Sequence, residues 1–286
     1  LCLKSGNAVV LRGGKEASQS NLALVEVVRH AIVEARLNPD VVQFVTDTDR
    51  AVVDQMIRLN SYFDLFIPRG GDELIRYVRD NATVPAITGG IGVVHAYADE
   101  SADVDKAANI IFNAKVQRPT VCNALDTLLV HSRLSTALLP VVAAKLASAG
   151  VEMRCDDRSI QFMRGVDRAV NPAEPSDFGQ EFLSLVLSVR TVDSIEEAID
   201  HIEQHGSGHT EVILTEDEAS GTKFLEEVEA SLVMVNASTR FNDGGQLGLG
   251  AEVAISTNKL HARGPMGLRE LTTYKWVGRG TGQIRA

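Results

Sequence analysis

The sequence predicts an α/β protein built on parallel sheets. Short apolar runs with strand character alternate with longer segments whose apolar residues recur at helical spacing. This alternation is typical of βαβ units, in which parallel strands lie side by side and helices cover their faces. Two glycine pairs, each placed after an expected strand and before an expected helix, favour the same class, because such turns lie at the carboxyl ends of parallel strands.

The first part of the chain contains four expected strands and three expected helices. In the longest helix, Leu22, Val25, Val28 and Ile32 lie on related faces. The strands are expected at residues 8–12, 41–45, 64–68 and 84–88, and the helices at 17–35, 51–59 and 72–81.

The alternation continues through the rest of the chain. Strands are expected at residues 92–98, 127–131, 183–190, 211–214 and 232–235, and helices at 102–115, 132–149, 194–204 and 219–229. Ser132 is expected to cap its helix, since a serine hydroxyl accepts from an otherwise unpaired backbone N–H. Glycine and proline cluster at 172–179 and 241–250, which predicts loops. Alternating apolar residues over 271–277 predict a final strand.

The first residues do not include an initiator Met. Residues 1–4 have the pattern of the last turn of a helix, and residues 5–7 look like its stop. We therefore expect the sequence to begin within a longer protein.

Composition excludes several classes of protein. The 286 residues carry a net charge of −10, which argues against a nucleic-acid binder that depends on phosphate contacts. The apolar runs are too short to span a membrane, and no secretory signal opens the chain. Three cysteines without a pairing pattern predict a reducing, cytoplasmic compartment. No spacing of His, Cys or acidic residues predicts a metal site.

Cys122 is the strongest candidate for a reactive group. It lies on a connector between an expected helix and an expected strand, with Lys115 and Arg118 close in sequence. Cationic neighbours lower the pKa of a thiol, and the thiolate is the nucleophile. The alternative is that Cys122 is a small buried hydrophobe, as most free cysteines are. Cys155 is expected to be less reactive, because Asp156 and Asp157 follow it, and Cys2 is expected to pack between leucines.

The two glycine pairs are candidate phosphate sites. Arg12 and Lys15 flank the first pair, and Gly70 and Gly71 form the second. Glycines allow a ligand to approach the backbone, and a helix N-terminus favours anions. Neither turn has the GxGxxG pattern of a dinucleotide site. The two cations could hold the 2′-phosphate that distinguishes NADP from NAD, or they could be solvated charges on an ordinary βα turn.

Four motifs together resemble one family. They are QRPTVCN at 117–123, VNASTRF at 235–241, GLGAE at 248–252 and KLHARGPMG at 259–267. They are long, they occur in order, and they resemble the γ-glutamyl phosphate reductases, also called glutamate-5-semialdehyde dehydrogenases, of the aldehyde dehydrogenase superfamily. The resemblance covers essentially the whole chain. It implies an aldehyde dehydrogenase-like α/β fold with two Rossmann-like parallel-sheet domains, the cofactor domain being incomplete, and a C-terminal β arm.

The resemblance implies a division of the chain and a reaction. Residues 1–90 would form part of an NADP-binding domain, 91–265 a catalytic domain, and 266–286 an oligomerisation strand. The enzyme would use NADPH to reduce L-glutamyl 5-phosphate to L-glutamate 5-semialdehyde and phosphate, in proline biosynthesis. Cys122 falls on the family's nucleophile, whose thiolate displaces phosphate to form a thioester. The expected partners are this substrate, the glutamate 5-kinase that supplies it, and further copies of the chain.

The resemblance also assigns roles to other residues. Arg12 and Lys15 match the stretch that binds the adenosine ribose, and Glu181 looks like the glutamate that holds the nicotinamide ribose. Hydrolytic aldehyde dehydrogenases have a general-base Glu before two glycines, where this chain has Thr88 before residues 89–90. A base that activates water would hydrolyse the thioester, so this departure suits a reductase.

Substrate contacts are expected from the polar loops. Arg118, Arg240 and Arg263 are candidates because guanidinium groups suit carboxylate and phosphate, and Asn123 is a further candidate beside the nucleophile. The alternative for these loops is an ordinary solvated surface. Two alternatives remain for the function: another acylating aldehyde dehydrogenase, such as one that uses coenzyme A, and a non-catalytic fragment of this fold.

Overall fold

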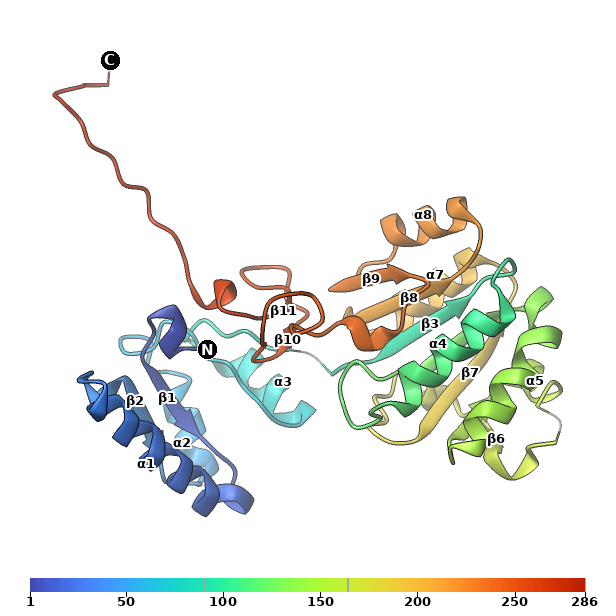
Figure 1. Cartoon of the computed structure of the whole chain (residues 1–286), viewed down its shortest axis with the longest axis horizontal. Coiled ribbons are helices and arrows are strands. Elements are labelled where there is room, and N and C mark those ends of the chain that lie inside the picture. Colours follow the sequence, from blue (N-terminus) through green and yellow to red (C-terminus); the bar gives the residue numbers. More distant parts are fainter. Residues whose placement is uncertain (90, 164, 286) are drawn as a thin grey trace.

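A parallel sheet of seven strands forms the larger part of the molecule (Figure 1). The computed structural model describes residues 1–89, 91–163 and 165–285, without the side chains of Asp72 and Asp167. The strand order is β6-β5-β7-β4-β3-β8-β9, and each pairing is parallel. The strands are β3 Val94–Ala98, β4 Thr127–His131, β5 Glu152–Cys155, β6 Val170–Pro172, β7 Val186–Val192, β8 Thr210–Leu214 and β9 Leu232–Val235.

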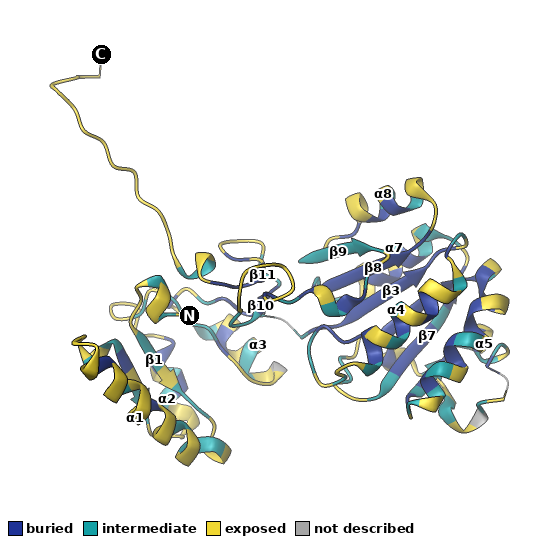
Figure 2. Cartoon of the chain, viewed as in Figure 1, coloured by how far each residue is buried: buried dark blue, intermediate teal, exposed yellow. Residues whose placement is uncertain are grey.

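Helices cover both faces of this sheet. They are α4 Val104–Val116, α5 Ser132–Ser148, α6 Asp157–Ile160, α7 Ile195–His205 and α8 Glu218–Glu227. Successive strand residues point to opposite faces, so Ala96 of β3 and Leu128 of β4 pack with α4 and α5. Their neighbours Tyr97 and Leu129, together with Ile213 of β8, pack with α7 and α8. Figure 2 shows the strands at the centre of this part buried on both sides.

The N-terminal part contains a smaller parallel sheet. Strands β1 (Val9–Arg12) and β2 (Val42–Val45) pair in register, and α1 (Ser18–Glu34) covers them through Val25 and Ile32. Helices α2 (Arg50–Met56) and α3 (Asp72–Asn81) follow. The outer face of α1 is exposed, as the yellow ribbon in Figure 2 shows.

The chain returns to the N-terminal part after β9. Strands β10 (Ile255–Ser256) and β11 (Gly264–Pro265) form a short antiparallel pair. Ala262 and Met266 pack against Ile87 in a cluster that also contains Leu65 and Ile67. Residues 253–266 therefore pack partly on the N-terminal part, whereas the domain boundaries predicted from the sequence follow residues 90 and 265. That division remains a prediction, and Gly90 itself lies outside the described residues.

Several predicted elements agree with the structure residue for residue. These are the helix at 72–81 and the strands at 127–131 and 232–235. The helix stop expected at 5–7 is also present: the 3₁₀ helix Leu3–Ser5 ends at Gly6, whose φ of 83° is left-handed.

The strands predicted at 64–68 and 84–88 are wrong in extent. The structure has a single parallel bridge there, between Phe66 and Ala86. Pro68 and Pro85 have no amide hydrogen to donate, so neither run can extend a hydrogen-bonded ladder.

Three strands of the large sheet were predicted poorly. Strands β5 and β6 were missed. Only Met153 and Cys155 of the four β5 residues are buried, and β6 is three residues long with none buried, so the apolar signal of each is short. The strand expected at 183–190 begins at Val186, because Leu183 has a left-handed φ of 50° that interrupts extended backbone.

Two further predictions need correction. His131 caps α5 instead of Ser132, and its Nδ1 accepts from the N–H of Arg133 over 3.2 Å. The strand predicted at 271–277 is absent from the described chain, where Tyr274 and Trp276 are 81% and 93% exposed. A strand needs a hydrogen-bonding neighbour, and the tail extends away from the rest of the molecule (Figure 1).

Candidate active site

Cys122 lies on the connector between α4 and β4, as the sequence predicted. The hydroxyl of Thr239 donates to the carbonyl of Asn123 over 2.7 Å, and the side chain of Asn123 donates to the carbonyl of Asn242 over 2.9 Å. These bonds tie the connector to a segment more than a hundred residues away. Asn123 is buried, and among the described residues its Oδ1 has no hydrogen-bond partner. That oxygen is the acceptor that Asn123 could offer in the predicted substrate contact.

Gly92 brings Glu181 and Cys122 together. A Cβ at position 92 would lie 2.0 Å from the carbonyl oxygen of Cys122, so only glycine allows this approach. The N–H of Gly92 donates to Oε1 of Glu181 over 3.1 Å. Two residues that the sequence assigned to different roles, nucleophile and cofactor contact, thus meet at one glycine.

The surroundings of Cys122 favour its neutral thiol. The pKa of Cys122 is raised to about 11, first by burial and then by the negative charges of Glu181 and Glu252. The backbone N–H of Cys122 and the positive charge of Arg69 oppose this shift. Burial and Asp156 raise the pKa of Cys155 to about 12, which agrees with the low reactivity expected for it.

The activation of Cys122 predicted from sequence neighbours is wrong. Lys115 is fully buried and donates to the carbonyl of Leu125 over 2.7 Å, and its Nζ lies 3.8 Å from Oδ1 of Asp126. Arg118 is exposed. Helix α4 ends between Lys115 and Arg118, and the connector then turns. Closeness in sequence therefore does not bring either positive charge close to the thiol.

Cys122 and the charged residues that act on it, Glu181, Glu252, Arg69 and Arg240, are called the Cys122 cluster below. Glu252 and Arg69 were not among the predicted site residues. Oε2 of Glu252 accepts from the N–H of Gly244 over 2.9 Å. Burial raises the pKa of Glu252, and Arg69 and Arg240 oppose the shift. Both missed residues lie inside motifs that the sequence singled out, the glycine-rich stretch 248–252 and the turn before α3, where their charges were the available signal.

Of the three predicted arginines, Arg240 lies near Cys122, and Arg118 lies near Arg240. Nε of Arg240 donates to Oε1 of Gln117 over 2.7 Å. Burial lowers the pKa of Arg240, and the charge of Arg118 lowers it further, whereas Cys122 raises it. Arg263 instead forms an ion pair with Glu229, 2.5 Å between nitrogen and oxygen. The structure thus brings Arg240 to the cluster, places Arg118 next to Arg240, and gives Arg263 a separate partner.

Thr88 holds a neutral hydroxyl where the hydrolytic relatives have a carboxylate. Its Oγ1 lies 3.3 Å from Oδ1 of Asn258 and donates to it. The residue is largely buried, and the adjacent Gly89 would place a Cβ 2.7 Å from the carbonyl of Ile255. The segment that resembles the general-base motif is therefore packed against the β10 segment.

Arg12 and Lys15 lie at the carboxyl end of the small parallel sheet. Nη2 of Arg12 donates to the carbonyls of Thr48 and Asp49, over 2.6 and 3.0 Å. Its Nε is buried and has no hydrogen-bond partner among the described residues. Lys15 is exposed at the start of the 3₁₀ helix Lys15–Ala17. A buried guanidinium nitrogen without an acceptor, beside an exposed ammonium, fits an anionic group of a dinucleotide.

Gly70 and Gly71 form the turn before α3. Gly71 is the N-cap of the helix, and a Cβ there would meet nothing within 4 Å. A Cβ at Gly70 would lie 2.9 Å from Cδ2 of Leu74. The open side of Gly71 leaves room for a ligand at this helix start.

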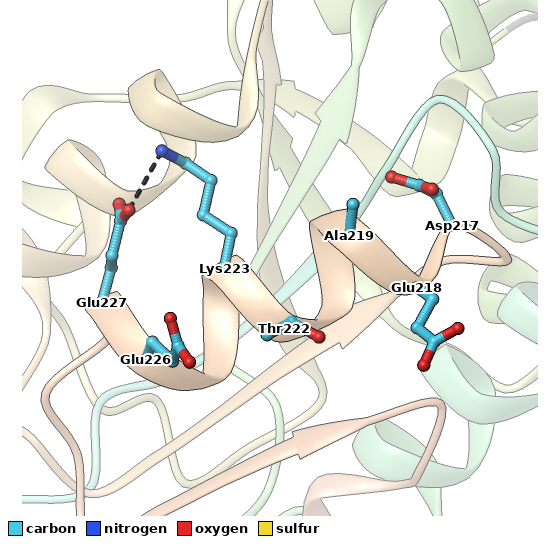
Figure 3. Close-up of a pocket in the computed structure, with 7 residues that line it drawn as sticks. All are labelled: Asp217, Glu218, Ala219, Thr222, Lys223, Glu226 and Glu227. Atoms are coloured by element: carbon cyan, nitrogen blue, oxygen red, sulfur yellow. Dashed lines mark ion pairs between the residues drawn. The ribbon is translucent and has the colours of Figure 1, made fainter.

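An acidic groove along α8 lies outside the Cys122 cluster. Figure 3 shows its lining residues, among which Lys223 pairs with Glu227 over 3.1 Å and Asp217 caps the helix. These charges are engaged in local bonds.

No set of three or more His, Cys, Asp or Glu in the described residues is arranged to hold a metal ion. None of the described helices has the length and apolarity needed to cross a membrane.

Known proteins with similar sequences and structures identify the family of this chain. A sequence model of the aldehyde dehydrogenase family matches residues 1–161 and 176–277. The γ-glutamyl phosphate reductase of Dehalococcoides mccartyi is 54% identical over 286 residues, which are 100% of this chain and 68% of that protein. The crystal structure of γ-glutamyl phosphate reductase from Thermotoga maritima matches with a TM-score of 0.94 at 48% identity, over 100% of this chain and 68% of that one.

The chain belongs to the γ-glutamyl phosphate reductases of the aldehyde dehydrogenase family. It is therefore an oxidoreductase, and its family uses NAD(P). An acetylating aldehyde dehydrogenase from Geobacillus thermoglucosidasius matches with a TM-score of 0.76 at 20% identity, over 99% of this chain and 71% of that one, which shows a shared fold. The predicted recognition and the predicted fold class are confirmed.

Proposed function

We propose that the chain catalyses the NADPH-dependent reduction of L-glutamyl 5-phosphate to L-glutamate 5-semialdehyde and phosphate, a step of proline biosynthesis. The observation that carries this proposal is the Cys122 cluster, in which a half-buried thiol meets charged groups of both signs. The names of relatives 54% identical over the whole chain support the choice of substrate.

The charges of the cluster suit this substrate. Glutamyl phosphate carries a phosphate, a carboxylate and an ammonium group. Arg69, Arg118 and Arg240 offer guanidinium groups for the two anions, and Glu252 offers a carboxylate for the ammonium group. Arg263, the third arginine predicted to bind substrate, would have to leave Glu229 to take part.

The thiol of Cys122 performs the covalent steps. Its Sγ attacks the acyl carbon, the S–C bond forms and the C–O bond to phosphate breaks, and the thiol proton leaves with the phosphate, so that a thioester remains on the enzyme. NADPH, when bound, would supply the hydride that reduces this thioester. The C–S bond of Cys122 would then break, the aldehyde would leave, and the thiolate would take up a proton from solvent. Thr88 has no carboxylate with which to activate water, so the thioester is spared from hydrolysis.

Residues of both parts of the chain would hold the cofactor. Arg12 and Lys15 would face the adenosine ribose and its 2′-phosphate, and the unpartnered Nε of Arg12 favours NADP over NAD. Gly70 and Gly71 would accommodate the pyrophosphate at the start of α3. Glu181, held at Gly92 beside Cys122, would position the nicotinamide ribose next to the thiol.

The expected partners follow from the substrate. Acyl phosphates hydrolyse readily in water, so a glutamate 5-kinase that makes the substrate would be a natural neighbour in the cytoplasm. We also propose that the chain forms homo-oligomers through residues 266–286.

The main competing function is that of an acylating aldehyde dehydrogenase that uses coenzyme A. It would share Cys122 and the neutral Thr88. Arginines beside the thiol favour a small anionic substrate instead. The other alternative, a non-catalytic fragment, predicts no turnover under any condition.

The decisive experiment runs the reaction in reverse. Glutamate 5-semialdehyde, NADP⁺ and phosphate are supplied to the 286-residue chain and to the product of its complete reading frame, and NADPH formation is followed by absorbance. We expect turnover that requires phosphate and is lost in Cys122→Ala, while Cys2→Ala retains it. Turnover with coenzyme A in place of phosphate would favour the competing enzyme, and phosphate-dependent turnover in Cys122→Ala would rule out the thioester.

A further inference from the structure

A buried ion pair lies directly behind the Cys122 cluster. Lys115 of α4 is fully buried and Asp126, the residue before β4, is 2% exposed. Nζ of Lys115 lies 3.8 Å from Oδ1 of Asp126 and donates to the carbonyl of Leu125 over 2.7 Å. The proposed reaction uses neither side chain.

The carboxylate of Asp126 joins two segments of the cluster. Oδ1 accepts from the N–H of Phe182 over 3.1 Å, and Oδ2 accepts from the N–H of Val94 over 3.3 Å. Phe182 follows Glu181 in the chain, and Val94 follows Gly92 by two residues. The N–H of Gly92 is itself bonded to Glu181 over 3.1 Å, so the carboxylate of Asp126 closes a ring of contacts that includes Glu181 and Gly92. Cys122 lies against this ring at Gly92.

The Phe182 segment is held in a conformation that needs such a support. Leu183 has a left-handed φ of 50°, which a residue with a Cβ rarely adopts. The ring of Phe182 lies between two cations, 5.9 Å from Nζ of Lys115 and 5.3 Å from Cζ of Arg154. The Asp126 bond to the Phe182 N–H fixes the backbone between Glu181 and this left-handed residue.

A buried ion pair is a poor means of stabilising a fold. The cost of removing two charges from water often exceeds their attraction, and apolar pairs of similar volume are commonly as stable. What an ionised carboxylate offers, and an apolar side chain does not, is acceptors for two backbone N–H groups. The placement of Asp126 therefore indicates a positioning role.

We propose that Asp126, paired with Lys115, is a positioning residue that sets Glu181 and Gly92 relative to Cys122, and thereby the fit of the nicotinamide ribose beside the thiol. The part of this inference that concerns the cofactor rests on the proposed function. The part that concerns Cys122 rests on the contacts alone.

The charge state of the pair gives the proposal a pH signature. Burial raises the pKa of Asp126 to about 7, with Lys115 opposing the shift and Glu181 adding to it. Burial also lowers the pKa of Lys115 to about 8. Arg154 is the remaining charge that faces Phe182, and its partners are Asp177 and Glu152. Without Lys115, Asp126 would be protonated near neutral pH and one of its two acceptors would become a donor.

The test compares Lys115→Met, Asp126→Asn and the double variant with the wild-type chain. The matched control is Lys145→Met, which removes a lysine on α5 whose Nζ bonds Asn109 at the surface. Two quantities are measured from pH 6 to 9: the dissociation constant of NADPH, by fluorescence titration, and the rate at which iodoacetamide alkylates Cys122, by mass spectrometry.

We expect Lys115→Met to weaken NADPH binding by about tenfold at pH 6.5 and to approach wild type as Asp126 ionises at high pH. Asp126→Asn should weaken binding similarly at every pH. Cys122 should be alkylated about threefold faster than in the wild type at pH 8 in Asp126→Asn, and at pH 6.5 in Lys115→Met, because a released Glu181 no longer raises the thiol pKa. The double variant lacks both charges of the pair and should resemble Asp126→Asn, which keeps the test valid if a single variant does not fold.

Wild-type values of both quantities in the folded double variant would overturn the proposal. Weakened binding with the same pH profile in Lys115→Met as in the wild type would show general damage instead of positioning, and would also overturn it. A wild-type chain that does not bind NADPH would contradict the proposed function, whereas faster alkylation in the variants would still support the positioning of Cys122.

Discussion

At the scale of the residue, the nucleophile role proposed for Cys122 contrasts with an environment that suppresses reactivity. Burial and two carboxylates raise its thiol pKa to about 11. At pH 7 a thiol of that pKa is almost entirely protonated, so the free enzyme is protected against oxidation and alkylation. Reaction then requires a change that arrives with the ligands. The positive charge of an oxidised nicotinamide placed near Sγ would lower the thiol pKa in the reverse direction.

The close approach of Gly92 to Cys122 leads to a prediction at the same scale. In Gly92→Ala the added Cβ would lie 2.0 Å from a backbone oxygen, so the connector carrying Cys122 must move. A displacement of about 1 Å at a nucleophile can cost roughly 100-fold in rate. We expect kcat of Gly92→Ala to fall by about that factor, as measured by NADPH formation.

Gly278→Ala is the control for this variant, because a Cβ there meets nothing within 4 Å. Its kcat should equal that of the wild type. Full activity in Gly92→Ala would show that the connector can shift without harm. The close approach of Gly92 to Cys122 would then not be needed for activity.

At the scale of the element, one row of the large sheet is polar. Thr127, His95 and Glu211 are register partners on β4, β3 and β8, and all three side chains are fully buried. Nδ1 of His95 lies 3.0 Å from Oε2 of Glu211. His209, just before β8, is also buried, with Nδ1 2.7 Å from the hydroxyl of Thr210. Protonation at acid pH should therefore destabilise this end of the sheet.

His209 leads to a prediction about acid stability. Burial lowers its pKa from 6.5 to about 4, so the unfolded chain takes up the proton first as pH falls. The stabilisation is complete above pH 6.5 and is lost progressively towards pH 4. The difference in pKa corresponds to about 3 kcal/mol at most. Urea unfolding at pH 7, 6, 5 and 4 should show a flatter pH dependence in His209→Gln than in the wild type.

The exposed His30 of α1 provides the matched control. His30→Gln should retain the pH dependence of the wild type. An unchanged slope in His209→Gln would mean that other groups, such as His201, whose pKa burial also lowers, account for acid unfolding.

At the scale of the whole molecule, the path of the C-terminal segment joins the two parts. Residues 253–266 pack on Ile87 and its neighbours, and the side chain of Asn7 donates to the carbonyl of Leu271 over 2.7 Å. Beyond that point the chain is extended and exposed (Figure 2). A tail with exposed Tyr274, Trp276 and Val277 has apolar side chains and unpaired backbone groups to offer to another copy.

Truncation tests that interpretation of the tail. A chain that ends at Thr272 keeps the Asn7 contact and loses the exposed residues. We expect it to have a smaller molar mass in light scattering than the full chain, with an unchanged far-UV spectrum. Tyr274→Ser with Trp276→Ser should have the same effect if side chains carry the contact. Equal masses in all three proteins would remove the oligomerisation role.

The sequence by itself determined the family, the fold class and the position of Cys122 between a helix and a strand. These features follow from local signals: hydrophobic periodicity, glycine pairs after strands, and long motifs in a fixed order. The strand at 127–131 and the helix at 72–81 were located to the residue because each has a clear apolar pattern and a clear end.

Only the tertiary structure decided what surrounds Cys122. Sequence neighbours suggested activation by Lys115 and Arg118, whereas the folded chain gives Lys115 to Asp126 and brings Glu181, Glu252 and Arg69 to the thiol from distant segments. The strands predicted at 64–68 and 271–277 depended in the same way on partners that a local pattern does not specify. Electrostatic interaction and strand pairing depend on distance in space, and only the folded chain sets that distance.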